Sequence, residues 1–208
     1  MSHNRYVIMA NGKGTRWGGH LGIPKQLIEI EGETLLRRIV RQLSFFDPCA
    51  EVIISSSDSR HETVGATRHK PRRNEIELDR FVHELIDNDT CFLYGDTFYT
   101  DEAISLITEA NNDPLTFFGD NRSIVGVSCR NIETFTKCLA EVRDGYEQGR
   151  LLSCIGWQVY ESYTGQLYSK RIVDKSFVWL DQLTAGFNSP EDLRRFIDSL
   201  DGEVAYSL

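Results

Sequence analysis

The sequence predicts an α/β fold in which helices cover both faces of a mostly parallel sheet. Apolar runs typical of strands alternate along the chain with segments of helical periodicity. Strands are expected at 6–9, 51–55, 90–94, 115–118, 124–129 and 172–180. Helices are expected at 33–45, 77–86, 101–110, 131–142, 151–163 and 190–200. Strands separated by helices favour a parallel sheet, which binds ligands at the carboxyl ends of its strands.

The first expected helix has one apolar and one polar face. The apolar face is expected to carry Leu35, Leu36, Ile39, Val40 and Leu43, and the polar face Arg37, Arg38, Arg41 and Gln42. The strand at 51–55 is entered from Asp47 and Pro48. Residues 56–75 are polar, rich in turn-forming residues and without a clear period, so no element is expected there.

The later helices are bounded by local signals. Thr100 is expected to cap the helix at 101–110, and Glu102 lies in its first turn, where the helix dipole favours an acidic side chain. Gly156 lowers the helical propensity of 151–163. Ser189 is expected to cap the last helix, with Pro190 at its first position.

A glycine-rich turn follows the first strand and predicts a phosphate site. It consists of Ala10, Asn11, Gly12, Lys13, Gly14, Thr15 and Arg16, and Lys25 follows nine residues later, directly after Pro24. Glycines let the backbone approach a bulky anion, and successive backbone N–H groups form an anion-binding concavity. The planar guanidinium of Arg16 can donate several hydrogen bonds to phosphate oxygens, and the ammonium group of Lys25 adds a localised positive charge. This combination suits the triphosphate of a nucleotide.

Two better-known phosphate-binding loops are excluded by spacing. A P-loop needs Gly-Lys followed by Ser or Thr, but Gly14 follows Lys13 and the position five before Gly12 is Val7. The dinucleotide-binding fingerprint needs a third glycine at position 17, which is Trp17. The longer pattern that runs from Gly12 to the Pro-Lys-x-Leu segment at 24–27 is therefore the informative one.

Asp96 is the candidate metal ligand. It follows an apolar strand and Gly95, at the same expected sheet edge as the glycine-rich turn. An aspartate in this position also occurs in ordinary turns, but a carboxylate beside a phosphate site is suited to Mg²⁺. That ion is usually held by one or two carboxylates together with substrate phosphates and water.

These segments resemble the MobA-like NTP transferases, the nucleotidyltransferases of the sugar-phosphate and molybdenum-cofactor type. The resemblance covers the first 45 residues, returns at Leu93-Tyr94-Gly95-Asp96, and returns again at 187–193, while 115–180 shows no family motif. It implies a Rossmann-like three-layer α/β/α nucleotidyltransferase fold with a mostly parallel mixed sheet. It also implies Mg²⁺ as cofactor.

The resemblance also assigns roles to residues. Nucleotide binding falls to Ala10, Asn11, Gly12, Lys13, Gly14, Thr15, Arg16 and Lys25, and catalysis to Arg16, Lys25 and Asp96. Asp96 and Asn188 correspond to the metal ligands. The family's partner position for Asn188 is Gly186, which has no ligating side chain. Asp181 is the alternative source of a second ligand, and Asn188 is equally explained as a helix-entry residue next to the Ser189 cap.

The implied reaction transfers an NMP from an NTP to a small phosphorylated acceptor and releases pyrophosphate. The base and the acceptor are not identified; a sugar 1-phosphate, a phosphocholine-like alcohol phosphate and a pterin-type cofactor are all candidates. A related glycosyltransferase that uses a nucleotide-sugar ranks lower, because such enzymes carry Asp-x-Asp and Asp96 is followed by Thr97 and Phe98. A non-catalytic nucleotide-binding module is the third interpretation. Gly186 is consistent with it, because this residue cannot supply the second metal ligand through a side chain.

Composition limits the other functions. A chain of 208 residues with 40% apolar content suits a single domain over 1–208. The net charge of −8 disfavours nucleic acid and anionic membranes as partners. The five scattered cysteines predict neither a zinc site nor a disulfide framework, and no apolar run approaches a membrane span or a signal-peptide core. A reducing cytoplasm is expected.

Two conspicuous features are interpreted structurally. The basic run 68–73 could receive a phosphorylated acceptor, but charge runs are usually solvated surface loops. Trp17 could stack on a base, but an aromatic residue beneath a loop is more often part of the packing.

Overall fold

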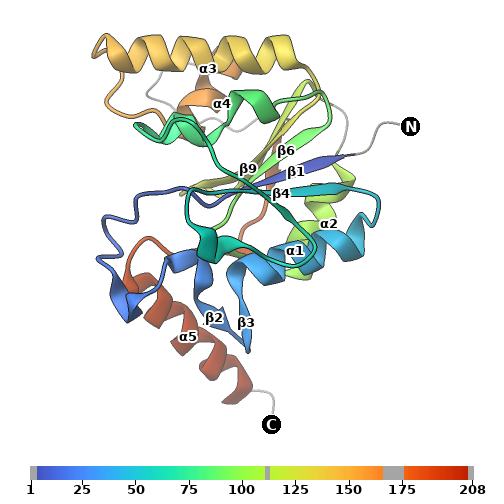
Figure 1. Cartoon of the computed structure of the whole chain (residues 1–208), viewed down its shortest axis with the longest axis vertical. Coiled ribbons are helices and arrows are strands. Elements are labelled where there is room, and N and C mark those ends of the chain that lie inside the picture. Colours follow the sequence, from blue (N-terminus) through green and yellow to red (C-terminus); the bar gives the residue numbers. More distant parts are fainter. Residues whose placement is uncertain (1–3, 111–112, 166–175, 206–208) are drawn as a thin grey trace.

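The chain forms one mixed sheet with helices on both faces in a computed structural model that describes residues 4–110, 113–165 and 176–205 (Figure 1). The sheet order is β10-β8-β9-β6-β1-β4-β5. The strands are β1 (Arg5–Met9), β4 (Glu51–Ser55), β5 (Thr67–His69), β6 (Thr90–Tyr94), β8 (Leu115–Gly119), β9 (Ile124–Cys129) and β10 (Phe177–Trp179). Among these strands β9 alone runs antiparallel to its neighbours. The predicted mostly parallel mixed sheet is confirmed.

The helices form the two outer layers (Figure 1). Helices α1 (Leu35–Phe46) and α2 (Asp101–Glu109) cover one face, and α3 (Ile132–Glu147) and α4 (Gly156–Thr164) cover the other. The last helix, α5 (Pro190–Ala205), lies beside a small hairpin of β2 (Glu29–Ile30) and β3 (Glu33–Thr34). The predicted three-layer arrangement is therefore confirmed.

Alternate residues of the central strands enter opposite cores. Ile8 and Leu93 belong to the apolar cluster beneath α1 and α2, whereas Val7 and Phe92 belong to the cluster beneath α3 and α4. All four side chains are fully buried. Successive side chains of a strand point to opposite faces, so strands covered on both sides are apolar throughout. This explains why the central strands read as unbroken apolar runs.

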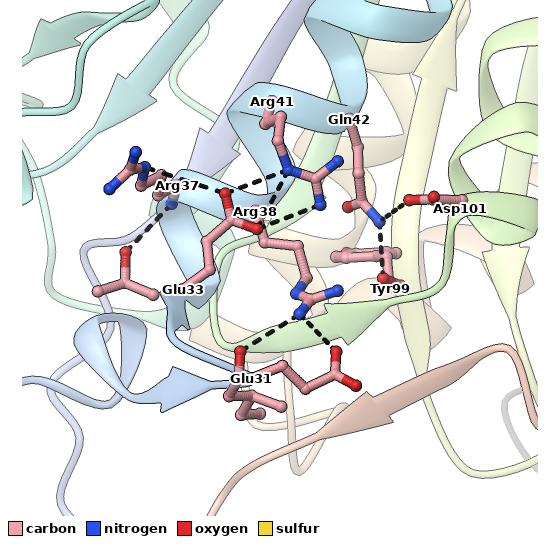
Figure 2. A network of polar contacts seen from close by, with 10 residues as sticks. Glu31, Glu33, Arg37, Arg38, Arg41, Gln42, Tyr99 and Asp101 are labelled. Atoms are coloured by element: carbon pink, nitrogen blue, oxygen red, sulfur yellow. Dashed lines mark hydrogen bonds and ion pairs between the residues drawn. The ribbon is translucent and has the colours of Figure 1, made fainter.

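One expectation about α1 is wrong, because two of its polar residues are buried (Figure 2). The Arg38 guanidinium donates to the Ile30 carbonyl at 3.2 Å and pairs with Glu31 at 2.8 Å. The Gln42 amide donates to the Tyr99 carbonyl at 3.0 Å and to the Asp101 carboxylate at 2.8 Å. Burial is possible because these polar groups find partners on neighbouring segments. Arg38 and Gln42 therefore tie α1 to the hairpin and to the start of α2.

Several segments differ from their expected structure. Residues 56–75 contain β5 and a short 3-10 helix at Ser59–His61, and 77–86 form two 3-10 helices, Glu77–Arg80 and His83–Leu85, rather than one α-helix. Two further 3-10 turns, His20–Gly22 and Lys25–Leu27, follow the glycine-rich turn. Residues 172–175 of the last expected strand lie outside the described part of the chain.

Gly156 begins α4 instead of interrupting a longer helix. A Cβ atom at Gly156 would lie 3.2 Å from the Ile124 side chain, so a glycine lets the helix start pack closely on β9. None of the helices in the described ranges is long and apolar enough to cross a membrane.

A short two-stranded sheet that the sequence did not predict links distant segments. Strand β7 (Thr97–Tyr99) pairs antiparallel with β11 (Thr184–Gly186), and this pairing sets Gly186 opposite Thr97. The Phe187 N–H donates to the Asp96 carbonyl at 3.1 Å. These contacts place the segment that precedes α5 directly beside Asp96.

Candidate active site

A cavity of about 500 Å³ opens at the sheet edge where β1 and β6 end and the antiparallel strand β9 begins. We call it the β6-side cavity. Its lining comes from six segments: Lys13–Arg16 with Lys25, Asn74–Glu77 with Arg80, Tyr94 with Asp96 and Thr97, Arg122–Val125, Ile155–Trp157 and Gly186–Asn188. This is the edge at which parallel sheets of this kind bind ligands.

The glycine-rich turn leaves β1 in a conformation that requires glycine. Gly14 has a φ of +58°, which side-chain-bearing residues rarely adopt. A Cβ atom at Gly12 would lie 3.1 Å from the Arg80 guanidinium. Trp17 is buried beneath the turn and its indole N–H donates to the Ile23 carbonyl at 3.0 Å. Trp17 therefore packs under the turn and anchors it.

Lys25 and Asp96 lie next to each other in the lining of the cavity. Their side chains form an ion pair, and only 9% and 14% of their respective side-chain surfaces are exposed. The Gly95 N–H donates to the Met9 carbonyl at 3.1 Å, which joins the ends of β6 and β1. A Cβ atom at Gly95 would lie 3.2 Å from that carbonyl oxygen. Glycine at this position thus allows Asp96 to sit beside the glycine-rich turn.

Arg16 and Asn188 meet at the rim. The Arg16 guanidinium donates to the Asn188 side-chain oxygen at 2.9 Å, across 172 positions of sequence. Asn188 is held by the start of α5, where the Asp192 carboxylate accepts from the backbone N–H groups of Asn188 and Ser189 at 3.0 and 2.8 Å. The Ser189 hydroxyl accepts from the Asp192 N–H at 3.3 Å, so Ser189 is the predicted cap.

The structure distributes the other residues predicted for the site between the β6-side cavity, a second cavity and the surface. Lys13, Gly14 and Thr15 line the β6-side cavity with Arg16 and Lys25. Ala10 is buried, and Asn11 and Gly12 line a second cavity on the other side of the turn. Asp181 is exposed and does not line the β6-side cavity. Arg68 of the basic run pairs with Glu62 at 3.2 Å, and none of residues 68–73 lines the cavity.

The metal-binding capacity of the cavity is small. Asp96 is the carboxylate beside the glycine-rich turn, Asn188 offers one amide oxygen, and Gly186 offers no side chain. The described residues contain no group of three or more His, Cys, Asp or Glu side chains placed to hold a metal ion. Such a donor set fits a Mg²⁺ ion that takes most of its ligands from nucleotide phosphates and water.

Two cationic residues of the cavity carry no sequence motif. Arg80 lies 5.8 Å from the centre of the Tyr94 ring and pairs with Glu77 at 3.5 Å, while Arg122 lies in the turn before β9. With these two, the lining holds five cations, Lys13, Arg16, Lys25, Arg80 and Arg122, and three carboxylates, Glu75, Glu77 and Asp96. The lining is therefore net cationic in a chain of net charge −8, which suits a polyanionic ligand.

One family model matches the first part of the chain. Residues 6–81 match the family model of the MobA-like NTP transferase domain. A search of curated protein sequences finds no match.

Solved structures resemble the chain over nearly its full length. CTP:phosphocholine cytidylyltransferase from Streptococcus pneumoniae has a TM-score of 0.63 at 14% identity, covering 96% of this chain and 100% of that one. Inositol-1-phosphate CTP transferase from T. maritima has a TM-score of 0.58 at 13% identity, covering 92% of each chain. The 4-diphosphocytidyl-2C-methyl-D-erythritol synthase from Anaerococcus prevotii has a TM-score of 0.58 at 13% identity, covering 96% and 99%.

At these identities the structural matches show the fold. The family model covers less than half of the chain, and its match over residues 6–81 confirms the resemblance to the MobA-like NTP transferases that was drawn from the motifs.

Proposed function

We propose that the chain transfers an NMP from an NTP to a small phosphorylated acceptor in a Mg²⁺-dependent reaction that releases pyrophosphate. One observation carries the proposal: Arg16, Lys25 and Asp96 meet at the glycine-rich turn in a cavity of net cationic lining. An NTP and a phosphorylated acceptor are both anions, and the cavity has cations on the turn and on the facing wall at Arg122. Its volume lies within the range of small-molecule sites.

In this reaction an oxygen of the acceptor phosphate attacks the α-phosphorus, and the bond to the β-phosphate oxygen breaks, so pyrophosphate carries away the electron pair. The backbone N–H groups of the turn and Arg16 would hold the β- and γ-phosphates. Lys25 would leave Asp96 for the α-phosphate, where negative charge grows in the transition state. Asp96 would hold a Mg²⁺ ion, which would supply charge neutralisation for the leaving group. The protein otherwise aligns the two reactants.

The acceptor would occupy the part of the cavity far from the turn. Arg122 offers a cation there, and Trp157 and Ile124 offer apolar surface. Two of the three similar structures named above are enzymes that act on phosphocholine and inositol 1-phosphate. Both are small alcohol phosphates, so we place this class first among the candidate acceptors. Sugar 1-phosphates and a pterin-type cofactor are the other candidates. Residues 1–208 would act as one domain in a reducing cytoplasm, where the five free cysteines would stay reduced.

Calorimetry with each of the four NTPs tests the nucleotide site. At least one NTP is expected to bind, and binding is expected to weaken when Mg²⁺ is omitted, because the metal neutralises part of the triphosphate charge beside Asp96. Absence of binding by all four NTPs in the presence of Mg²⁺ would remove the proposed function.

A non-catalytic nucleotide-binding module remains the second candidate, and Gly186 is the observation that favours it. A module of this kind would bind the NTP with the same turn but would release no pyrophosphate from any acceptor. A glycosyltransferase would instead require a nucleotide-sugar and would release a nucleoside diphosphate. Pyrophosphate release therefore separates the proposed function from both.

Gly186→Asp is expected to strengthen metal binding about tenfold, because it adds a second carboxylate next to Asp96. A Cβ atom at Gly186 would meet no atom within 4 Å, and the residue is not among those with positive φ. Manganese affinity measured by electron paramagnetic resonance in the presence of an NTP would report the change. Gly186→Ala is the matched control, since it adds the Cβ without a ligand. Equal manganese affinities in the two variants would show that the metal does not bind next to β11.

A further inference from the structure

Arg80 brings a cation to the glycine-rich turn from a segment that carries no motif. Its side chain lines the β6-side cavity and is 18% exposed. A Cβ atom at Gly12 would lie 3.1 Å from Nη2 of Arg80, so the guanidinium rests against the backbone of the turn. The centre of the Tyr94 ring lies 5.8 Å from Cζ of the same guanidinium. The charge of Arg80 is therefore held near both the turn and the last residue of β6.

The described residues engage the donors of this guanidinium only weakly. An arginine side chain carries five N–H donors. Arg80 pairs with Glu77 at 3.5 Å, whereas a charge-assisted hydrogen bond usually measures about 2.7–2.9 Å. The same Glu77 carboxylate also accepts from the Tyr94 hydroxyl, again at 3.5 Å. A guanidinium that is largely removed from water and loosely paired suits an anionic ligand whose oxygens accept from it.

The segment that carries Arg80 is anchored by the carboxylate of Asp79. The side chain of Asp79 is 2% exposed, and one of its oxygens accepts from the backbone N–H groups of Glu75 and Ile76 at 2.8 and 3.1 Å. The other oxygen accepts from the Arg143 guanidinium of α3 at 2.6 Å. A buried carboxylate needs such partners, because an unpaired buried charge is costly. These three contacts tie the segment to α3.

Apolar packing adds to this anchor. Leu78 and Phe81 are buried in the core beneath α3 and α4. The Phe81 ring packs edge-to-face on Phe92 of β6 and on Phe135 of α3, with ring centres 5.4 and 5.5 Å apart. The backbone that carries Arg80 is thus fixed by the core as well as by Asp79. A side chain that is held in place before a ligand binds loses less freedom on binding.

We infer that Arg80 donates to the β- or γ-phosphate of the NTP, and that Asp79 and Arg143 are positioning residues that hold it there. This inference rests on the proposed function and adds a phosphate contact that none of the motifs carries. The proposed function puts these two phosphates on the backbone N–H groups of the turn, against which Arg80 rests. Arg16 would hold them from the end of the same turn. The leaving pyrophosphate would then receive charge from a wall that α3 anchors.

Calorimetry on Arg80→Met tests the contact with two probes, the Mg²⁺ complex of the tightest-binding NTP and the Mg²⁺ complex of pyrophosphate. Methionine keeps an unbranched side chain and removes the charge and the donors. Both dissociation constants are expected to rise about tenfold, because one charge-assisted hydrogen bond is lost. Unchanged constants would refute the contact. A loss for the NTP alone would also overturn the inference, because it would separate Arg80 from the β- and γ-phosphates.

Arg194→Met is the matched control. Arg194 forms the same kind of i,i+3 pair, with Glu191 at 2.6 Å, and it lines neither the β6-side cavity nor the second cavity. The substitution removes one arginine charge from the surface of α5 and should change neither dissociation constant.

A double-mutant cycle tests the positioning role. Arg143→Met is expected to weaken pyrophosphate binding about fivefold, and to have no further effect when Arg80 is already replaced by Met, since no guanidinium is left to position. Arg143→Lys keeps a charge beside Asp79 and should stay within about twofold of the unaltered protein. An equal loss with and without Arg80 would make Arg143 merely structural. If Arg143→Met does not fold, Asp79→Asn takes its place, because asparagine keeps an acceptor for the two N–H groups.

A spectroscopic measurement on the unaltered protein needs no variant that might fail to fold. The ¹⁵N-detected Nε–H signal of Arg80 should shift when the Mg²⁺ complex of pyrophosphate is added, and the absence of a shift would refute the contact. NTP binding and pyrophosphate release by the unaltered protein test the proposed function itself. Failure of that function and failure of this inference are therefore distinguishable.

Discussion

Asp96→Asn is expected to lower nucleotidyl transfer by at least about 10³-fold while the fold stays intact by circular dichroism. Asp96 is the carboxylate that the β6–β1 junction holds beside the glycine-rich turn. In the proposed reaction a metal at Asp96 would supply several kcal/mol of transition-state stabilisation, and its loss, at about 1.4 kcal/mol per factor of ten, would give this magnitude. An amide oxygen holds a hard divalent cation far less well than a carboxylate does.

Asn188→Ala is the companion variant, and its effect should be smaller. Asn188 is neutral and exposed, and its side-chain oxygen accepts from Arg16 in the structure. The variant is expected to raise the Mg²⁺ concentration needed for half-maximal rate and to keep measurable activity. Near-normal turnover by Asp96→Asn would indicate that the metal binds instead at Glu75 or Glu77, the other carboxylates of the cavity. If Asn188→Ala is as inactive as Asp96→Asn, both side chains are full ligands.

Lys25→Ala is expected to lower kcat about 10²–10³-fold, the usual cost of removing one charged donor aimed at developing charge. The dissociation constant of the NTP should change much less, because Lys25 is paired with Asp96 in the structure. In the proposed reaction it would gain its phosphate contact mainly in the transition state. Pre-steady-state measurement of a single turnover, together with calorimetric NTP binding, separates the two quantities.

Lys137→Ala is the matched control for Lys25→Ala. Lys137 lies exposed on α3, 3.9 Å from Glu141, and removing it subtracts the same charge away from both cavities. It is expected to leave kcat unchanged. If Lys25→Ala also turns over at the normal rate, Lys25 has a structural role as the partner of Asp96.

The sequence was sufficient for the parts of the site that short segments define. Gly14 could be assigned to the phosphate-binding turn because a backbone that bends there, as its positive φ shows, favours glycine. Asp96 could be assigned to the sheet edge because it follows closely after an apolar strand. The carboxyl ends of parallel strands share one edge, so the convergence of the turn and Asp96 followed from the fold class alone.

The rest depended on contacts between distant segments. Arg80 and Arg122 carry no local pattern, and they reach the cavity only through the loop that precedes β6 and the turn that precedes β9. Pairing of β7 with β11 joins residues near 98 and 185, which no periodicity could indicate. Arg38 and Gln42 have polar side chains that predict exposure, but a tertiary partner for each polar group overrides that preference.

His61 illustrates the same limit. It lies in a polar segment without a clear period, so its burial could not be expected from the sequence. The Ser56 hydroxyl oxygen lies 2.7 Å from Nδ1 of His61 and fixes its ring. The burial of the side chain, and the fact that Nε2 has no hydrogen-bond partner among the described residues, became visible only in the structure.

Transfer of the α-phosphoryl group with its nucleoside can be followed by the fate of radioactive label. The protein would be incubated with Mg²⁺, a panel of small phosphorylated alcohols and sugars, and the best-binding NTP labelled at either the α- or the γ-phosphate. The α-label is expected to enter a new acceptor-linked product, and the γ-label is expected to appear only in pyrophosphate. Transfer of γ-label to the acceptor, or its release as inorganic phosphate in the absence of any pyrophosphatase, would rule out nucleotidyl transfer as the reaction.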